Sequence, residues 1–213
     1  MVHFLHIGKT GGTALTQMLK EVHSSRYHFK IHPHEFTLQE VPEGHLAMFF
    51  LRNPVDRFVS GFYSRKRKGQ PAYDVPWNEA EEKAFHAFET PNALAEALSS
   101  DEGKVREQAM DAMKGIRHVN THFGDWLVSE TYLEKHKRQL FYIGFQENFS
   151  EDVKQLYKKI TRKALKTEIA KSHQAPEKED KYLSAIAQEN LAHWYSEDIQ
   201  LYQFCKKLAQ KVN

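Results

Sequence analysis

The pattern of apolar residues near the start of the chain changes from a short, mostly apolar run to a helical spacing. Residues 2–7 are mostly apolar, as in a short buried strand. Residues 8–13 are glycine, lysine and threonine only, and after them apolar side chains recur every three or four positions up to residue 22. This pattern predicts a strand, a tight loop and a helix in succession.

Three further runs predict strands. Residues 45–51, HLAMFFL, form the most apolar stretch of the chain, which predicts a central, parallel strand buried on both faces. Residues 27–31 predict a short second strand, and residues 140–145 predict another core strand. Because helical patterns separate these runs, the sequence predicts an α/β fold with a P-loop-type parallel sheet flanked by helices.

Helical patterns fill most of the remaining chain. A helix is expected to start at Pro54, directly after the strand at 45–51, because proline fits the first helical turn. Residues 79–115 predict a helical insertion with helices at 79–89, 91–99 and 102–114. Further helices are expected at 147–160, 181–194 and 196–212, with a long polar loop at 162–180.

Composition limits the class of protein. A chain of 213 residues suits one domain over 1–213 that includes the insertion. The net charge of +2 does not point to nucleic acid, and a single cysteine excludes a disulfide framework and suits a reducing compartment. The N-terminus leads straight into the first strand, and no apolar run approaches the ~20 residues that span a bilayer. We therefore expect a soluble, cytoplasmic protein without stable membrane insertion.

The loop at residues 8–13 has the chemistry of an anion site. Free amides at a helix start and the helix dipole both favour negative charge. Gly11 and Gly12 can take positive φ and let the backbone come close to a ligand. Lys9 adds a mobile cation, and Thr10 and Thr13 add hydroxyl groups. These features predict binding of phosphate or sulfate.

This loop differs from the standard ATP-binding loop. That motif has a glycine five residues before its Gly-Lys-Thr, a position that is His3 here. Two glycines follow the lysine instead of preceding it, and the loop is too short to wrap a β,γ-phosphate pair with Mg²⁺. A tight strand-to-helix turn without a ligand is the alternative interpretation, since these residue types are common at helix starts.

Arg52 is a second candidate anion ligand. It follows the strand at 45–51, so it lies beside the first loop if the two strands are neighbours in the sheet. Arginine binds phosphate with two parallel hydrogen bonds, which favours an anion clamp over a structural ion pair. Ser60 lies about two turns into the next helix. The basic run at 65–68 supports either favourable charge at a helix end or an electropositive rim for an acidic substrate.

Two histidines follow the predicted strand at 27–31. Pro33 ends the strand, so His32 and His34 lie on a loop at a strand end, where α/β sheets bind ligands. Two solvated loop histidines are the alternative. A zinc pair is disfavoured because the chain has one cysteine and no evident third ligand.

Three stretches together resemble one family. HIGKTGGTAL resembles the loop that binds the 5′-phosphosulfate in sulfotransferases using 3′-phosphoadenosine-5′-phosphosulfate (PAPS). FFLRNPVDRFVSGFY is similar to the family's second motif, where an arginine and a serine hold the 3′-phosphate. LFYIGFQENFSEDVKQL resembles the later strand and helix of the carbohydrate-directed branch. The resemblance covers most of the chain except the helical insertion.

The resemblance implies a PAPS-dependent sulfotransferase that needs no metal, because lysine and arginine supply the neutralising charge. Lys9 would lie on the bridging oxygen, and Arg52 and Ser60 would hold the 3′-phosphate. Lys171 and Ser172 resemble the loop that closes over the cofactor. The residues implied for the phosphosulfate are Thr10, Gly11, Gly12 and Thr13.

Within this branch the chain is most similar to the uronyl and heparan sulfate 2-O-sulfotransferases. In those enzymes a His-x-His on the loop after the second strand supplies the general base, and His34 or His32 occupies the corresponding place. Other branches use a glutamate nearby, so Glu35 stays a rival. The resemblance implies a carbohydrate hydroxyl, or that of another small molecule, as the acceptor.

Two other classes of protein remain as alternatives. A P-loop kinase or NTPase would need an aspartate after an apolar strand to hold Mg²⁺, whereas the central strand here is followed by Arg52. A non-catalytic module would bind the product nucleotide 3′-phosphoadenosine-5′-phosphate (PAP) without transferring a group. Lys9 and the nearby histidines favour an enzyme over such a module.

Overall fold

The structure is a computed structural model that describes residues 1–165 and 179–213. The described residues form two compact units. The sheet unit consists of 1–53, 122–165 and 200–213, and the helical unit consists of 54–121 and 179–199. The prediction of a single domain over 1–213 stays a prediction. Lys171 and Ser172 lie outside the described residues.

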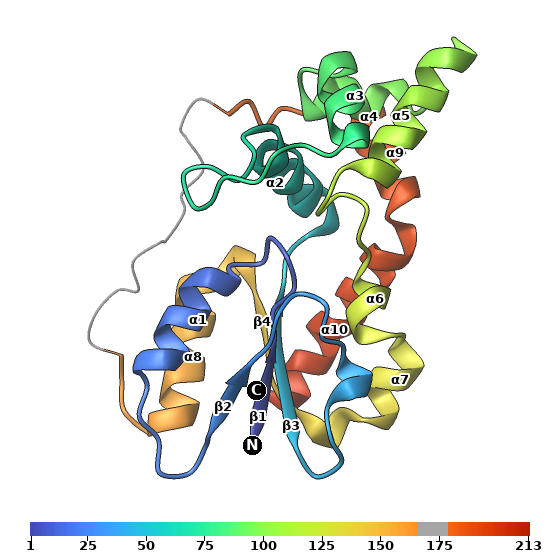
Figure 1. The fold of residues 1–213 in the computed structure, drawn as a ribbon. Coiled ribbons are helices and arrows are strands. Elements are labelled where there is room, and N and C mark those ends of the chain that lie inside the picture. The colour runs from blue at the N-terminus through green and yellow to red at the C-terminus, as the bar shows by residue number, and fades with distance from the viewer. Residues whose placement is uncertain (166–178) are drawn as a thin grey trace. The chain divides into compact units, whose positions relative to one another are not determined.

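A four-stranded parallel sheet forms the centre of the sheet unit (Figure 1). Its order is β2-β1-β3-β4, and all described pairs are parallel. The strands are β1 (Val2–Leu5), β2 (Phe29–Ile31), β3 (Leu46–Leu51) and β4 (Leu140–Phe145). This confirms the predicted α/β class and the inner position of the most apolar strand.

Helices cover both faces of this sheet (Figure 1). One face carries α1 (Gly12–Glu21) and α8 (Phe149–Thr161). The other carries α6 (Phe123–Leu127), α7 (Glu130–Lys135) and the end of α10 (Ser196–Val212). Three short 3₁₀ turns complete the unit: η1 (Leu38–Glu40), η2 (Lys137–Gln139) and η3 (Gln146–Asn148).

The residues of β3 show why this strand is so apolar. Met48 and Phe50 pack with the core residues of α1 and α8, while Ala47, Phe49 and Leu51 pack on the opposite face. All five side chains are fully buried. Because alternate residues of a strand point to opposite faces, a strand covered on both sides must be apolar at every position.

β2 is shorter than the predicted strand at 27–31. The Ser24 hydroxyl accepts hydrogen bonds from the backbone N–H groups of Arg26 and Tyr27, at 3.2 and 3.1 Å. Such side-chain bonds compete with strand pairing and form a turn. The turn delays the strand until Phe29.

The outer edge of β4 is occupied by a side chain. The backbone N–H of Ile143 donates to Oδ1 of Asn213 at 3.0 Å, and Nδ2 of Asn213 donates to the Ile143 carbonyl at 2.8 Å. Both backbone groups of one residue in a parallel strand point to the same side, so the amide pairs with the side of Ile143 that faces away from β3.

The helical unit contains α2 (Pro54–Lys66), α3 (Glu79–Ala87), α4 (Pro91–Ala97), α5 (Gly103–Gly115), α9 (Ala185–Trp194) and the start of α10. The three helices predicted for the insertion and the start of α2 at Pro54 are confirmed. The core of the unit includes Phe58, Phe62, Phe85, Leu94 and Met113. Within the described parts of both units, no helix has the length and hydropathy needed to cross a lipid bilayer.

A buried carboxylate holds the helical unit together. Glu81 is completely buried and accepts hydrogen bonds from Arg65 Nε at 2.7 Å and from Arg117 at 3.1 Å. Burial alone would raise the pKa of Glu81, but the bonds from Arg65 and Arg117 lower it to about 2. Arg65 is itself buried. Arg65 therefore pairs with a carboxylate in the interior of this unit, a role that neither interpretation of the 65–68 run included.

Candidate functional site

The pairing of β1 with β3 brings the two predicted anion ligands to one edge of the sheet. The strands are parallel, with Leu5 opposite Phe49. Parallel neighbours lie about 4.8 Å apart, so the loop at 8–13 and Arg52 leave adjacent strands at the same carboxyl edge. The neighbour relation on which the Arg52 prediction depends is therefore present, and this half-buried arginine belongs to the same unit as the loop.

The loop has a left-handed backbone at two positions. Lys9 has a φ of 69° and Gly11 a φ of 90°. Between them the hydroxyl of Thr10 donates to the carbonyl of Ile7 at 2.8 Å. Thr10 is buried and its hydroxyl hydrogen is used in this bond, so it shapes the turn. Its remaining donor toward an anion is its backbone N–H.

Helix α1 presents its amino end at this loop. The first bond within the helix runs from the Leu15 N–H to the Gly11 carbonyl at 3.3 Å. The backbone N–H groups of residues 12–14 therefore have no carbonyl within the helix to bind. The first turn is uncharged, reading Gly-Thr-Ala-Leu. These amides and the positive end of the helix dipole suit an anion.

Two of the loop glycines, Gly11 and Gly12, are required by their surroundings. A Cβ on Gly11 would lie 2.5 Å from Oε1 of Gln146 and 2.6 Å from the ring of Phe149. A Cβ on Gly12 would lie 2.0 Å from the ring of His6. Oε1 of Gln146 is buried and has no hydrogen-bond partner among the described residues. The loop thus packs closely against η3, the start of α8 and the residue that follows β1, beside an unsatisfied polar atom.

Glu147 holds the backbone next to Arg52. The N–H of Asn53 donates to Oε1 of Glu147 at 2.5 Å, and the hydroxyl of Tyr202 donates to Oε2 at 3.1 Å. Glu147 follows β4, and Tyr202 lies on α10. One carboxylate therefore links the ends of two neighbouring strands to the C-terminal helix.

The two candidate bases lie in different surroundings. His32 is buried, and its Nε2 is 2.8 Å from Nδ1 of His3, whose Nε2 is 2.9 Å from Nδ1 of His45. These distances are those of N–H···N hydrogen bonds, so the three rings form a string. His34 is exposed, and its Nδ1 donates to the carbonyl of His6 at 2.6 Å. Because His6 lies against Gly12, His34 is held beside the loop and His32 is not.

Two histidines of the string, His3 and His32, are kept neutral by their surroundings. Burial, together with the nearby His32, His45, Lys30 and N-terminal amino group, lowers the pKa of His3 to about 4. Burial and Lys30 also lower the pKa of His32, against an opposing effect of Glu40. At neutral pH the rings of His3 and His32 act as hydrogen-bonding groups without charge.

Acid is therefore expected to destabilise the protein through His3. The unfolded chain has an ordinary histidine pKa of 6.5, so between pH 6.5 and about 4 it binds a proton that the folded chain does not. This contribution is fully present above pH 6.5 and falls by about 1.4 kcal/mol per pH unit within that window. Urea unfolding from pH 7.5 to 4.5 measures it. A His3→Gln variant should show a shallower slope, and equal slopes would exclude His3 as the source.

The remaining predicted residues are less closely tied to the loop. Thr13 is exposed in the first turn of α1. Ser60 lies half-buried on α2 and belongs to the helical unit. Lys171 and Ser172, as noted, fall outside the described residues. The sheet unit thus brings together Lys9, the loop glycines, Arg52 and His34.

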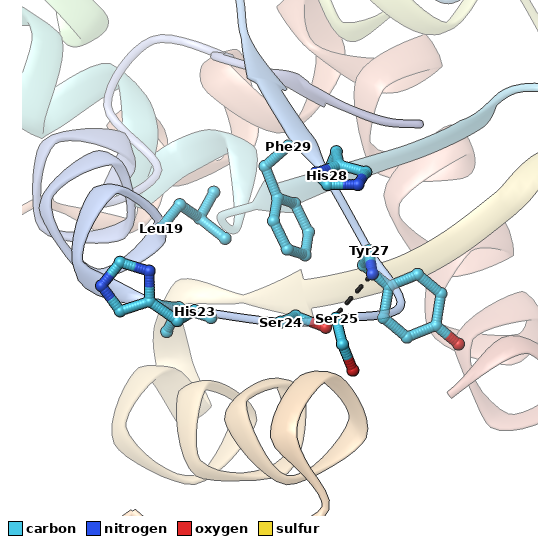
Figure 2. Close-up of a pocket in the computed structure, with 8 residues that line it drawn as sticks. Leu19, His23, Ser24, Ser25, Tyr27, His28 and Phe29 are labelled. Carbon is cyan, nitrogen blue, oxygen red and sulfur yellow. Dashed lines mark hydrogen bonds between the residues drawn. The ribbon is translucent and has the colours of Figure 1, made fainter.

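A hollow of about 530 Å³ lies elsewhere in the sheet unit. It is lined by Leu19, Val22, His23, Ser24, Ser25, Tyr27, His28 and Phe29 (Figure 2). These residues connect the end of α1 to the start of β2. α1 begins at the loop and runs for ten residues, about 15 Å, before this hollow. It is therefore not part of the site at the loop.

Sequence reasoning missed three residues around the site: His6, Trp126 and Gln146. Nε1 of Trp126 donates to the carbonyl of His34, and the other two contact the loop glycines. The available signal was weak. His6 is a polar residue between Leu5 and Ile7 in a mostly apolar run, two residues before the glycine loop.

Comparison with known families agrees with this geometry. Residues 1–205 match the family model described as the Sulfotransferase family, a range that includes the loop, Arg52, both histidines and Glu147. A search of curated proteins found no match. Sulfotransferases generally take the sulfuryl group from PAPS. Because the match covers nearly the whole chain, the protein belongs to the sulfotransferase family and is a sulfotransferase.

Proposed function

We propose that the enzyme transfers a sulfuryl group from PAPS to a carbohydrate hydroxyl, in line, with His34 as general base. The observation that carries the proposal is the loop after β1, whose helix start lies at the same sheet edge as Arg52. PAPS has a phosphosulfate at one end and a 3′-phosphate on the ribose. Two cationic groups on neighbouring strand ends suit such a nucleotide.

The residues of the loop fit the phosphosulfate. The amides of residues 12–14 and the ammonium of Lys9 are donors and positive charges where this anion would bind. Gly11 and Gly12 allow the backbone to approach it closely. The amide of Gln146, whose oxygen is unsatisfied, would present its NH₂ group to an anion after a 180° rotation.

Lys9 and His34 have distinct roles in the proposed step. The acceptor oxygen forms a bond to sulfur while the bond from sulfur to the 5′-phosphate oxygen breaks, giving a sulfate ester and PAP. Lys9 neutralises charge on the departing phosphate. His34 takes the acceptor proton. A carbonyl oxygen only accepts hydrogen bonds, so Nδ1 of His34 carries hydrogen and the lone pair of the neutral ring is on Nε2.

The environment of the rival bases favours His34 over His32. Nε2 of His32 is hydrogen-bonded to His3 within a buried string. Glu35 is exposed on the same loop and stays the rival candidate. The carbohydrate acceptor and the assignment of Ser60, Lys171 and Ser172 to donor binding rest on the motif resemblance.

The proposed function is tested with PAP and with radiolabelled PAPS. PAP is expected to raise the melting temperature without Mg²⁺, and label is expected to move to a member of a panel of mono- and oligosaccharides. Stabilisation only by Mg-ATP would favour the kinase alternative. PAP binding with transfer to no acceptor, sugar or otherwise, would favour a non-catalytic module. Either result would overturn the proposal.

An Arg52→Ala variant is expected to bind PAP about 10- to 100-fold more weakly, since hydrogen bonds to charged groups contribute about 1.5–3 kcal/mol. Calorimetry with PAP and AMP, which differ only in the 3′-phosphate, measures the effect. The variant should lose affinity for PAP and retain its affinity for AMP. Arg138→Ala, an exposed arginine of the same unit, is the matched control. Equal losses of affinity for PAP and AMP would show that Arg52 does not bind the 3′-phosphate.

A further inference from the structure

The ring of His6 lies between two parts of the site. His6 directly follows β1 and precedes the loop. Its ring is 4.2 Å from the ring of His34 and 5.7 Å from that of Phe4, centroid to centroid. The side chain is half-buried. The His6 ring therefore contacts a core residue of β1, the loop and the proposed base.

The first contact is with the start of α1. A Cβ on Gly12 would lie 2.0 Å from Cδ2 and 2.1 Å from Nε2 of His6, well inside any tolerated separation. Unlike Gly11, Gly12 lies within the helix and needs no left-handed backbone. The reason for glycine at position 12 is therefore the space that the His6 ring fills.

The second contact is with His34. The His6 carbonyl accepts the Nδ1 hydrogen of His34 at 2.6 Å, and the two rings are packed against each other. Nε1 of Trp126 donates to the backbone carbonyl of His34. The ring and the backbone of His34 are thus both held, and the bond to His6 fixes its tautomer.

The charge of His6 is compatible with this arrangement. Burial, followed by the proximity of His34, lowers the pKa of His6 to about 4. His6 is therefore neutral at physiological pH. A neutral neighbour does not oppose the positive charge that His34 gains when it takes a proton, whereas a second imidazolium at this distance would.

We infer that His6 is a positioning residue, whose ring fixes the distance between the start of α1 and the general base and whose carbonyl holds that base in its reactive tautomer. The inference rests on the proposed function, because it assigns the base role to His34. The inference adds to the proposed function that one side chain, that of His6, sets the position of the base relative to the sulfate-binding loop.

Transfer kinetics test the link to His34. His6→Ala should lower kcat about 10- to 100-fold, because a displacement of about 1 Å can reduce rates to this degree, while the Kd of PAP stays within about threefold. His6→Phe keeps a ring and should restore most of kcat. In a His34→Asn background, His6→Ala should have no further effect. His23→Ala, an exposed histidine after α1, is the control.

Three outcomes would overturn the inference. If His6→Ala lowered kcat by the same factor in the wild-type and His34→Asn backgrounds, His6 would not act through His34. A loss of PAP affinity matching the loss of kcat would indicate a merely structural role. Full activity of His34→Asn would show that His34 is not the base, and the inference about His6 would fail with it. The proposed sulfuryl transfer is tested separately, and it fails if the wild-type protein transfers no label.

A binding experiment tests the packing without any acceptor. Gly12→Ala alone should weaken PAP binding strongly, because its methyl group meets the His6 ring. The double variant His6→Ala, Gly12→Ala should recover affinity, since the ring is gone and alanine suits a helix. Failure of the double variant to bind better than Gly12→Ala would contradict the spacing role of the ring.

Discussion

A Lys9→Ala variant is expected to lose sulfuryl transfer by at least about 10²- to 10³-fold while it stays folded. In the proposed mechanism the Lys9 ammonium neutralises charge on the departing 5′-phosphate. Lys9 already carries a Cβ at a φ of 69°, so alanine makes no new demand on the backbone. Single-turnover transfer from radiolabelled PAPS measures the chemical step directly.

The matched control for Lys9 is Lys20→Ala. Lys20 lies in the last turn of α1, the helix that follows the loop, and is exposed, so its removal alters the charge of the unit without touching the loop. Its transfer rate should equal that of the wild type. Near-normal turnover in Lys9→Ala, or unfolding of that variant, would contradict the role assigned to the ammonium.

A His34→Asn variant is expected to lower kcat by about 10²- to 10⁴-fold, the usual effect of losing a general base. Asparagine keeps an N–H donor that can bond to the carbonyl of His6, but it has no basic nitrogen. The affinity for PAP should therefore persist. Steady-state kinetics with saturating acceptor, together with PAP calorimetry, separate the two quantities.

His32→Asn and Glu35→Gln are the comparison variants for this test. The His32→Asn substitution should lower stability more than turnover, because the His32 ring belongs to the buried string with His3. Glu35 is exposed, and its change to glutamine should leave both properties near the wild-type level. Undiminished turnover in His34→Asn together with a large loss in either comparison variant would transfer the base role to that residue.

Local sequence pattern was sufficient for most of the fold. The run at 45–51 predicted an inner strand because a strand covered on both faces has no position for a polar side chain, and β3 has this environment. Pro54 marked the start of α2 because proline lacks only a hydrogen bond that the first turn does not make. Such signals depend on neighbours in the chain alone.

The site could be predicted only in part, because its finer contacts join distant segments. The glycine loop has a local signature, but the different surroundings of the two candidate bases do not. His32 and His34 are one residue apart, and the turn that starts at Pro33 directs them to different partners, His3 and His6. The part played by His6 depends on Gly12 and His34 at once, a relation that no local spacing expresses.

The bond between Asn213 and Ile143 also bears on self-association. An unpaired strand edge is a template on which another polypeptide can add a strand. On β4 the amide of Asn213 already takes both the donor and the acceptor that Ile143 offers outward. Among the described residues β4 has no strand on this side, and an incoming copy of the protein would have to displace the Asn213 amide before it could pair with Ile143.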